Sequence, residues 1–345
     1  MSTQTEIAEQ PERIAELITK QRKAVEEVAA AIRQRQVPYV FLAARGTSDN
    51  AGRYANYLWG ARNGLPMALA TPSLFTYYQR PPKLAGALVV GVSQSGQSPD
   101  IVAVLEEGRR QGCLTLAITN EPGSPLAGAA DFVLDVQAGA EKAIAATKTY
   151  TTELMTIAML SVALGGESAA WKELRRVPAW MRQVLKQEKL IAQAALRYRY
   201  MRQCVVLGRG YNYSTAFEAS LKLKELTYVE AEPYSSADFL HGPIAMVERG
   251  FPVMVTAPLG KVFEPLLEVM ARLRKEFLAD LLVVSNAKKA LSLAQVPLSM
   301  PAEVPEWLSP LIAILPMQLL AYHIALVKGY DPERPRSIGK VTETR

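Results

Sequence analysis

Three serines and a glutamine lie close together in one short stretch of this chain, and their chemistry suits an anion. In VVGVSQSGQSPD an apolar run ends and a helical run begins, and between them lie Ser93, Gln94, Ser95 and Ser98. The first N–H groups of a helix lack partners within the helix and carry partial positive charge, so they can bind phosphate. Small hydroxyls add donors, and Gly96 lets the backbone come close. The stretch predicts a phosphate site, with helix capping by Ser98 as the structural alternative.

The same stretch also limits the kind of phosphate ligand. It contains neither the GxxxxGK[ST] motif of a triphosphate site nor the GxGxxG motif of a dinucleotide site. A phosphate monoester is therefore the predicted ligand. Thr47 and Ser48, in ARGTSDNAG, end an earlier strand in the same way. They are candidates to face the same ligand, although a turn followed by a helix cap explains them equally well.

The second half of the chain carries residues suited to proton transfer. In TAFEASLKLKEL, Glu218, Lys222 and Glu225 are spaced i, i+4 and i+7, so they project from one face of a helix. An exposed Glu–Lys pair worth about 0.3 kcal/mol is the structural alternative. His241 lies beside Gly and Pro in a predicted loop, where an imidazole is better placed for proton transfer than for packing. His323 lies in an apolar helical run and is predicted to be a core residue.

The elements that must position these residues alternate between strands and helices. The short apolar runs YVFLAA, GALVVGV, LTLAIT and DFVLDV are predicted strands, and helical stretches separate most of them. An amphipathic helix is predicted ahead of them, over about residues 7–36. This alternation is typical of a parallel sheet with helices on both faces. Ligands of such sheets bind beyond the carboxyl ends of the strands.

The pattern begins again after a charged helical connector. CVVLGRG matches VFLAARG, FPVMVTAPLGK matches GALVVGVSQSGQ, and LLVVSN is similar to TLAITN. The chain is therefore predicted to be α/β, with two tandem doubly wound parallel-sheet domains of flavodoxin-like type. The serine-rich turn becomes APLGK in the second copy, so we expect the copies to differ in task. The expected segments are an N-terminal helical segment (1–36), a first domain (37–166), the connector (167–200), a second domain (201–330) and a C-terminal tail (331–345).

Composition argues against several other classes of protein. Of the 345 residues, 49% are hydrophobic and 21% charged, which is typical of a globular protein. The net charge is +6, but the basic residues are scattered, so no nucleic acid is expected as a partner. The two cysteines fit the cytoplasm, and no cluster has zinc-site spacing. The polar N-terminus is unlike a signal peptide, and prolines interrupt the longest apolar stretch, so no membrane is expected.

Taken together, the motifs resemble the sugar isomerase (SIS) domain superfamily. GTS, SQSGQS, ATKTYTTEL, GRG, EASLKLKEL, HGP and a C-terminal lysine segment occur in the family's order and cover essentially the whole chain. The sequence is most similar to the tandem-SIS isomerase module of glucosamine-6-phosphate synthase and to stand-alone aminosugar-phosphate deaminases and isomerases. The resemblance implies two tandem SIS domains, a sugar phosphate as substrate, no cofactor and a homodimer with shared active sites.

The resemblance also implies roles for single residues. Glu225 would move a proton between C1 and C2 of the sugar, and His241, contributed across a dimer interface, would assist ring opening. Lys340 would reach the reactive carbon of the sugar. The serine-rich turn (Ser93, Gln94, Ser95 and Ser98) would hold the phosphate. Further substrate contacts are implied at Thr47, Ser48, Glu218, Lys222 and the position of Ala146.

Departures from the synthase favour deamination over synthesis. Residue 2 is Ser2 and the SIS-like region begins almost at once, so we expect no glutaminase domain and no release of ammonia from glutamine. Ala146 replaces a serine of the synthase, and the tail GKVTETR is closer to the stand-alone enzymes. We therefore expect an aminosugar-phosphate deaminase/isomerase that converts glucosamine 6-phosphate to fructose 6-phosphate and ammonia. The alternatives are a fructosamine-6-phosphate deglycase, another phosphosugar isomerase, or a non-catalytic phosphosugar sensor.

Overall fold

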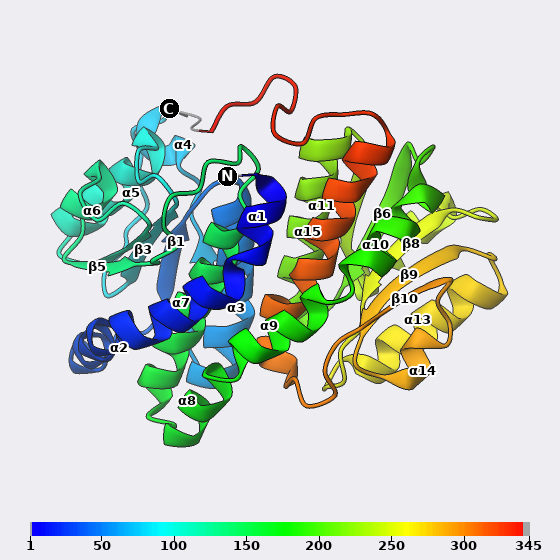
Figure 1. The fold of residues 1–345 in the computed structure, drawn as a ribbon. Helices are drawn as coiled ribbons and strands as arrows, with labels where there is room; N and C mark the ends of the chain where they lie inside the picture. Colours follow the sequence, from blue (N-terminus) through cyan, green and yellow to red (C-terminus); the bar gives the residue numbers. More distant parts are fainter. Residues whose placement is uncertain (1, 341–345) are drawn as a thin grey trace. The chain divides into compact units, whose positions relative to one another are not determined.

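The computed structural model describes residues 2–340, which form two compact units, each built around one five-stranded sheet (Figure 1). The β1–β5 unit comprises residues 9–142 and 148–176 and the chain from Gly339 onward. The β6–β10 unit comprises the chain up to Ala8 and residues 143–147 and 177–338. The short segment 143–147 therefore belongs to a different unit from the residues on either side of it.

The β1–β5 unit contains a parallel sheet with the strand order β2-β1-β3-β4-β5. Every residue of β3 and β4 is buried, because helices cover both faces of a parallel sheet. The four strands predicted from the sequence are confirmed, whereas β2 is too short and too exposed to give an apolar signal. The strands are β1 (Val40–Ala43), β2 (Met67–Leu69), β3 (Leu88–Ser93), β4 (Leu114–Thr119) and β5 (Phe132–Asp135).

Helices pack on this sheet in two groups. Helices α2 and α3 pack against α7, whereas α5 contacts α4 and α6 (Figure 1). The helix predicted over residues 7–36 is wrong in one respect, because it is divided into α1 and α2 at Glu9. Pro11 lies in the first turn of α2, where its missing N–H costs least. The helices are α2 (Gln10–Gln34), α3 (Gly46–Asn63), α4 (Ser73–Thr76), α5 (Pro99–Arg110), α6 (Pro125–Gly128), α7 (Lys148–Gly165) and α8 (Ser168–Leu174).

The β6–β10 unit repeats this topology. Its strand order is β10-β9-β8-β6-β7, and numbered within each unit both sheets read 2-1-3-4-5, so the predicted duplication is confirmed. The sequence does not predict β7, which is polar, or β10, which contains a proline. The strands are β6 (Gln203–Gly208), β7 (Glu230–Ser235), β8 (Pro252–Thr256), β9 (Asp280–Ser285) and β10 (Val296–Ser299).

Helix α15 is the core helix of the β6–β10 unit. The stretch Glu306–Val327 is long and apolar enough to cross a membrane, but 78% of its most apolar window is buried, and α15 packs against α9, α10 and α11. It is therefore the buried helix that the sequence predicts. The helices are α1 (Thr3–Ala8), α9 (Val177–Leu185), α10 (Glu188–Ala195), α11 (Tyr213–Thr227), α12 (Ser236–Phe239), α13 (Phe263–Lys275), α14 (Lys288–Leu291) and α15 (Ser309–Val327), with 3-10 turns at Leu196–Tyr198, Gly210–Asn212, Pro243–Met246 and Glu306–Leu308.

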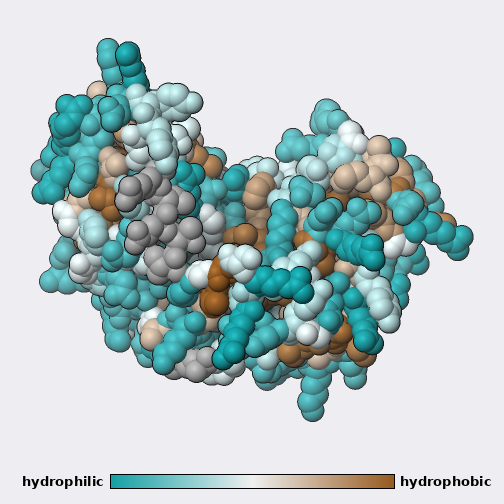
Figure 2. All heavy atoms as spheres, turned by 90° about the horizontal axis from the view of Figure 1, so that it is seen from above, coloured by the Kyte–Doolittle hydropathy of each residue, from teal (hydrophilic) through white to brown (hydrophobic). Residues whose placement is uncertain are grey.

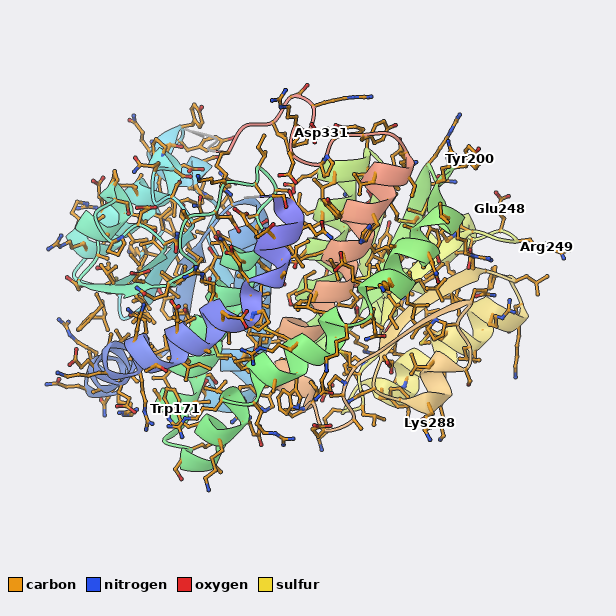
Figure 3. All side chains as sticks on the ribbon, in the orientation of Figure 1. Trp171, Tyr200, Glu248, Arg249, Lys288 and Asp331 are labelled. Atoms are coloured by element: carbon orange, nitrogen blue, oxygen red, sulfur yellow. The ribbon has the colours of Figure 1, made fainter. Side chains whose placement is uncertain are left out.

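Polar side chains dominate the surface. Hydrophilic residues cover most of the face drawn in Figure 2, with smaller hydrophobic patches between them. Figure 3 shows Tyr200, Glu248 and Arg249 pointing outward, and all three are exposed. The apolar side chains instead fill the space between each sheet and its helices.

Candidate functional site

The serine-rich turn lies in the β1–β5 unit, between β3 and α5. Ser93 is the last residue of β3, and Ser98 directly precedes α5. The hydroxyl of Ser93 accepts a hydrogen bond from the N–H of Gly96 at 3.1 Å, and that of Ser95 accepts one from the N–H of Gln97 at 3.3 Å. Because a hydroxyl oxygen can accept while its proton donates, both side chains brace the turn and keep a donor for a ligand.

Gly96 is required where it stands in this turn. Its φ is +61°, in the left-handed region, and a Cβ at this position would lie 2.1 Å from Oγ of Ser124. The carbonyl of Gly96 also accepts a hydrogen bond from the N–H of Leu126 at 3.1 Å. The turn is therefore packed closely against the start of α6, a packing role for Gly96 that the sequence analysis does not predict.

Capping of α5 does not explain Ser98. This residue occupies the N-cap position with extended backbone, but its side chain makes no capping hydrogen bond. Ser124, by contrast, does cap α6, because its hydroxyl accepts from the N–H of Ala127 at 3.4 Å. The backbone N–H groups of Ser95 and Ser98 donate to no residue within the part of the chain that the structure describes. The capping alternative is wrong for Ser98, and phosphate binding stays the prediction for this turn.

The corresponding turn of the β6–β10 unit, between β8 and α13, holds an anion from its own chain. The carboxylate of Glu306 accepts hydrogen bonds from the N–H of Lys261 at 2.8 Å and that of Val262 at 3.4 Å. A Cβ on Gly260 would lie 2.1 Å from Cδ of Glu306, so the carboxyl group fills the space beside this turn. Two turns of equivalent topology therefore differ. A carboxylate accepts from the N–H groups of one, whereas the other bonds two N–H groups to its own serine hydroxyls and keeps those of Ser95 and Ser98 as donors.

Thr47 and Ser48 lie in the first turn of α3, directly after β1. The Ser48 side chain is buried, and its hydroxyl donates to Oε1 of Glu153 on α7 at 2.8 Å. In this arrangement Ser48 presents an acceptor to a ligand, because its one proton is already donated. An acceptor suits a sugar hydroxyl better than a phosphate oxygen.

On α11, Lys222 joins the two predicted carboxylates. Its Nζ lies 3.4 Å from Oε1 of Glu218 and 2.6 Å from Oε2 of Glu225. The Glu218 and Lys222 side chains are 0% and 1% exposed, so the alternative of an exposed surface pair is wrong. Glu225 is 23% exposed and is the member of the cluster that solvent can reach. A buried ammonium thus orients one accessible carboxylate, which is the arrangement that a proton-transfer group needs.

His241 and Ala146 belong to the same unit as that cluster. His241 is exposed in the turn after α12, and its backbone N–H donates to the carbonyl of Asp238 at 3.0 Å. Among the described residues, no hydrogen bond or ion pair joins the His241 side chain to the α11 cluster. The predicted site residues thus form two groups: Thr47, Ser48, Ser93, Gln94, Ser95, Ser98 and Lys340 in the β1–β5 unit, and Ala146, Glu218, Lys222, Glu225 and His241 in the β6–β10 unit.

The repeated topology agrees with the comparison of this chain with known proteins. The SIS domain family matches residues 35–163 and 198–328. The chain belongs to the SIS domain family. The glutamine–fructose-6-phosphate aminotransferase (isomerizing) of Thermus thermophilus is 33% identical over 331 residues, which are 93% of this chain and 54% of that protein. This SIS chain therefore spans about half the length of the curated relatives it matches.

Solved structures of other SIS proteins have the same fold. A Silicibacter pomeroyi protein, provisionally assigned as a phosphosugar isomerase, is 32% identical with a TM-score of 0.87, covering 96% of this chain and 99% of its own. The C-terminal domain of glucosamine-fructose-6-phosphate aminotransferase from Francisella tularensis is 26% identical with a TM-score of 0.84, covering 96% and 98%. The fold predicted from the motifs, two tandem SIS domains, is confirmed.

Sequence reasoning missed Arg45, which lies beside the serine-rich turn of this SIS protein. Its guanidinium contacts Oδ2 of Asp100 through Nε at 2.9 Å and through Nη2 at 2.8 Å. Asp100 is buried in the first turn of α5, so the pair fixes a half-exposed cation at the start of that helix. Asp100 balances the charge of Arg45, and the half-exposed guanidinium places further N–H donors where an anion is predicted. The sequence feature that could have identified Arg45 is its position before Gly46, but the Arg-Gly pair is interpreted only as part of a repeat.

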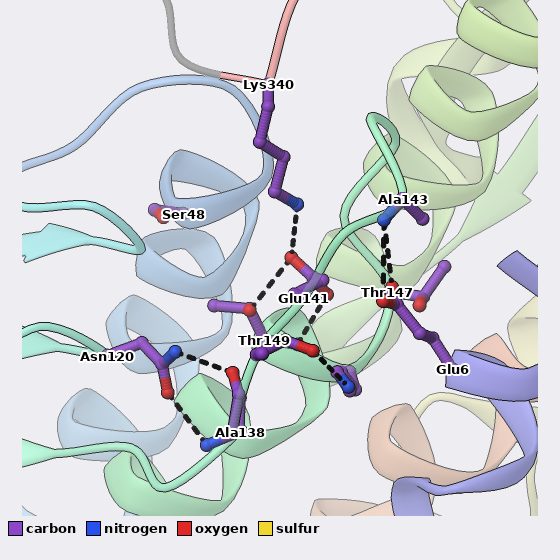
Figure 4. A network of polar contacts seen from close by, with 12 residues as sticks. Glu6, Ser48, Asn120, Ala138, Glu141, Ala143, Thr147, Thr149 and Lys340 are labelled. Atoms are coloured by element: carbon purple, nitrogen blue, oxygen red, sulfur yellow. Dashed lines mark hydrogen bonds and ion pairs between the residues drawn. The ribbon is translucent and has the colours of Figure 1, made fainter. Parts of the chain in front are cut away.

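Glu141 was also missed, and it contacts the C-terminal lysine (Figure 4). Nζ of Lys340 lies 2.8 Å from Oε2 of Glu141. The Glu141 side chain is fully buried and also accepts from the N–H and the hydroxyl of Thr149, at 3.1 and 2.9 Å. The remaining residues of the predicted tail, 341–345, lie outside the described part of the chain. No spacing in the sequence relates Glu141 to Lys340, because they are far apart along the chain.

Proposed function

We propose that this SIS protein binds a sugar phosphate and catalyses aldose–ketose isomerisation. The observation that carries the proposal is the contrast between the two equivalent turns. Glu306 supplies an anion to one of them, whereas the turn from Ser93 to Ser98 keeps its hydroxyl protons and the N–H groups of Ser95 and Ser98 as donors and lies beside Arg45. A dianionic phosphate monoester matches those donors and that charge. The similarity to a protein provisionally assigned as a phosphosugar isomerase supports the substrate class.

Glu225 carries out the proton transfer in this proposal. With the sugar in its open-chain form, the carboxylate removes the proton on C2 and returns it to C1, so one group serves both carbons. Lys222 holds the carboxylate in position through its ion pair at 2.6 Å. His241 of the partner subunit in a homodimer assists ring opening at the ring oxygen, which an imidazole can do as acid or base.

The finer proposal is deamination of a 2-amino aldose 6-phosphate. Transfer of the C2 proton to C1, with an amine proton passing to O1, gives a hydroxymethyl group at C1 and an imine at C2, and water hydrolyses that imine to a ketose and ammonia. Glucosamine 6-phosphate and water thus give fructose 6-phosphate and ammonia, with all atoms balanced. The resemblance to the synthase places Ala146 where that enzyme carries a serine, which supports deamination over synthesis.

The decisive experiment incubates the purified chain with glucosamine 6-phosphate and measures ammonia and fructose 6-phosphate. We expect both to appear in equal amounts, and E225Q to lose activity by about 10²-fold or more. The variant E232Q is the matched control, because Glu232 forms an exposed pair with Lys224 and should retain wild-type rates.

A substrate panel separates the remaining functions. Interconversion of an aldose phosphate and its ketose without ammonia would retain isomerisation and remove the deaminase proposal. Release of an amine from a fructosamine 6-phosphate would indicate a deglycase instead. A sugar phosphate that binds but stays unchanged by NMR would contradict catalysis altogether and indicate a sensor.

A further inference from the structure

We propose that Glu141 is a positioning residue that holds the ammonium of Lys340 at the start of α7. Its importance for turnover rests on the proposed function, in which Lys340 reaches the sugar. The docking of the lysine does not depend on that function, and it can be measured without substrate. The inference adds the Glu141 carboxylate to the site, although no sequence motif and no residue spacing assigns it there.

Glu141 is fixed in place by the elements of its own unit. It lies in the loop after β5, and its carboxylate accepts from the N–H of Thr149 at 3.1 Å and from the hydroxyl at 2.9 Å. Thr149 is the second residue of α7, so the carboxylate lies at the positive end of the helix dipole. The side chain is fully buried, and a carboxylate so held stays oriented when a cation approaches.

Lys340 needs such a partner, because no helix or strand carries it. Helix α15 ends at Val327, and the described chain from there to Lys340 contains neither a helix nor a strand. A lysine on irregular backbone has many rotamers and many backbone conformations, so fixing it in one of them costs conformational entropy. The Glu141 carboxylate, 2.8 Å from Nζ, is a contact that favours one of them.

One face of α7 connects this pair to the predicted substrate contacts. Thr149 and Glu153 are four residues apart on α7, so their side chains project from the same face. Glu153 accepts from the hydroxyl of Ser48 at 2.8 Å, and Thr149 holds Glu141. The first two turns of α7 thus set both Ser48 and, through Glu141, Lys340. Helices that follow parallel strands begin at the carboxyl edge of the sheet, where the serine-rich turn also lies.

The direct test measures how fast Lys340 reacts with a trace of acetic anhydride in the absence of substrate. A protease that cleaves after glutamate releases Lys340 within residues 334–343, where mass spectrometry can quantify its acetylation. An amine nitrogen held against a carboxylate is shielded from the reagent, so it reacts slowly. We expect Lys340 to react about fivefold faster in E141Q than in the wild type, with E141D in between.

The control is an ion pair of the same kind on the surface. Lys23 and Glu27 lie 3.8 Å apart, with side chains 90% and 61% exposed, so E27Q should change the labelling of Lys23 by less than about twofold. If E141Q does not fold, T149V keeps both charges, removes one hydrogen bond to Glu141 and should raise Lys340 labelling in the same direction. Unchanged Lys340 labelling in the folded variants would overturn the inference.

Turnover then tests the positioning role. With the sugar phosphate substrate, E141Q should lower kcat about 10-fold or more and change KM little, because the phosphate contacts remain, and E141D should recover part of the loss. Faster labelling with an unchanged kcat would overturn the positioning role. If the wild type turns over no sugar phosphate, the proposed function fails, and the labelling result alone decides whether Glu141 docks Lys340.

Discussion

Replacing Glu306 tests whether the two turns are equivalent anion sites. In E306A, the N–H groups of Lys261 and Val262 lose the acceptor that now lies 2.8 and 3.4 Å away. The space beside Gly260, where the carboxyl group lies within 2.1 Å of a Cβ position, is vacated as well. The variant therefore presents the start of α13 much as the serine-rich turn presents the start of α5.

The expected magnitudes follow from these contacts. One good hydrogen bond and one long one at a helix start are comparable to an N-cap interaction, so E306A should lower the free energy of unfolding by about 1 kcal/mol. Inorganic phosphate should then offset the loss. At a concentration tenfold above a dissociation constant in the millimolar range, the added stabilisation is about 1.4 kcal/mol.

The assay is thermal unfolding of the wild type, E306A and E306Q, each with and without phosphate at constant ionic strength. Glutamine retains an acceptor oxygen, so E306Q should lose less stability than E306A and gain less from phosphate. The stabilisation of the wild type by phosphate measures the contribution of the serine-rich turn alone. If phosphate stabilises E306A no more than the wild type, the equivalence of the two turns is refuted, and the central argument for the proposed function goes with it.

Three further predictions use other parts of the chain. G96A should destabilise the fold by about 2 kcal/mol or more and weaken phosphate binding in a titration, because a Cβ would lie 2.1 Å from Oγ of Ser124 at a left-handed φ, and binding as tight as wild type would contradict this. Mixing inactive E225Q with inactive H241N should restore about a quarter of the wild-type activity if subunits of a dimer exchange and share sites, whereas no recovery would contradict a shared site. Burial lowers the pKa of His323 below its usual 6.5, so the unfolded chain binds this proton more readily and stability falls as the pH falls below that value. H323Q should flatten the loss of stability between about pH 7 and pH 5 in denaturant titrations, and an unchanged slope would contradict the assignment.

The sequence predicts the elements that are long, apolar and central. The runs that became β3 and β4 are buried along their whole length, which is why composition alone identifies them. Edge strands carry a weaker signal, since β2 has three residues and β7 is the polar run EAEPYS. The divided helix at the N-terminus follows from Pro11, whose position is visible in the sequence but whose effect depends on where packing places the break.

The candidate site is predictable only where its residues are local. The i, i+4, i+7 spacing places Glu218, Lys222 and Glu225 on one face of α11, but it does not reveal that two of them are buried. The contacts between Glu306 and Lys261, and between Glu141 and Lys340, join residues 45 and 199 positions apart. Such pairs follow from the folded topology, so a single sequence carries no pattern for them.

The two copies of the duplicated fold differ at this turn, and the stabilisation that a helix cap supplies helps to explain the difference. When backbone N–H donors at the start of a helix find no acceptor in the chain, the fold lacks the stabilisation of a helix cap, which is about 1 kcal/mol. The β6–β10 unit gains that stabilisation by placing Glu306 against Lys261. The β1–β5 unit does not, although Ser98 occupies the N-cap position from which its hydroxyl could have done so. An interaction forgone at one turn and made at its equivalent is what the proposed phosphate site requires, because a built-in cap would compete with a phosphate for the same N–H groups.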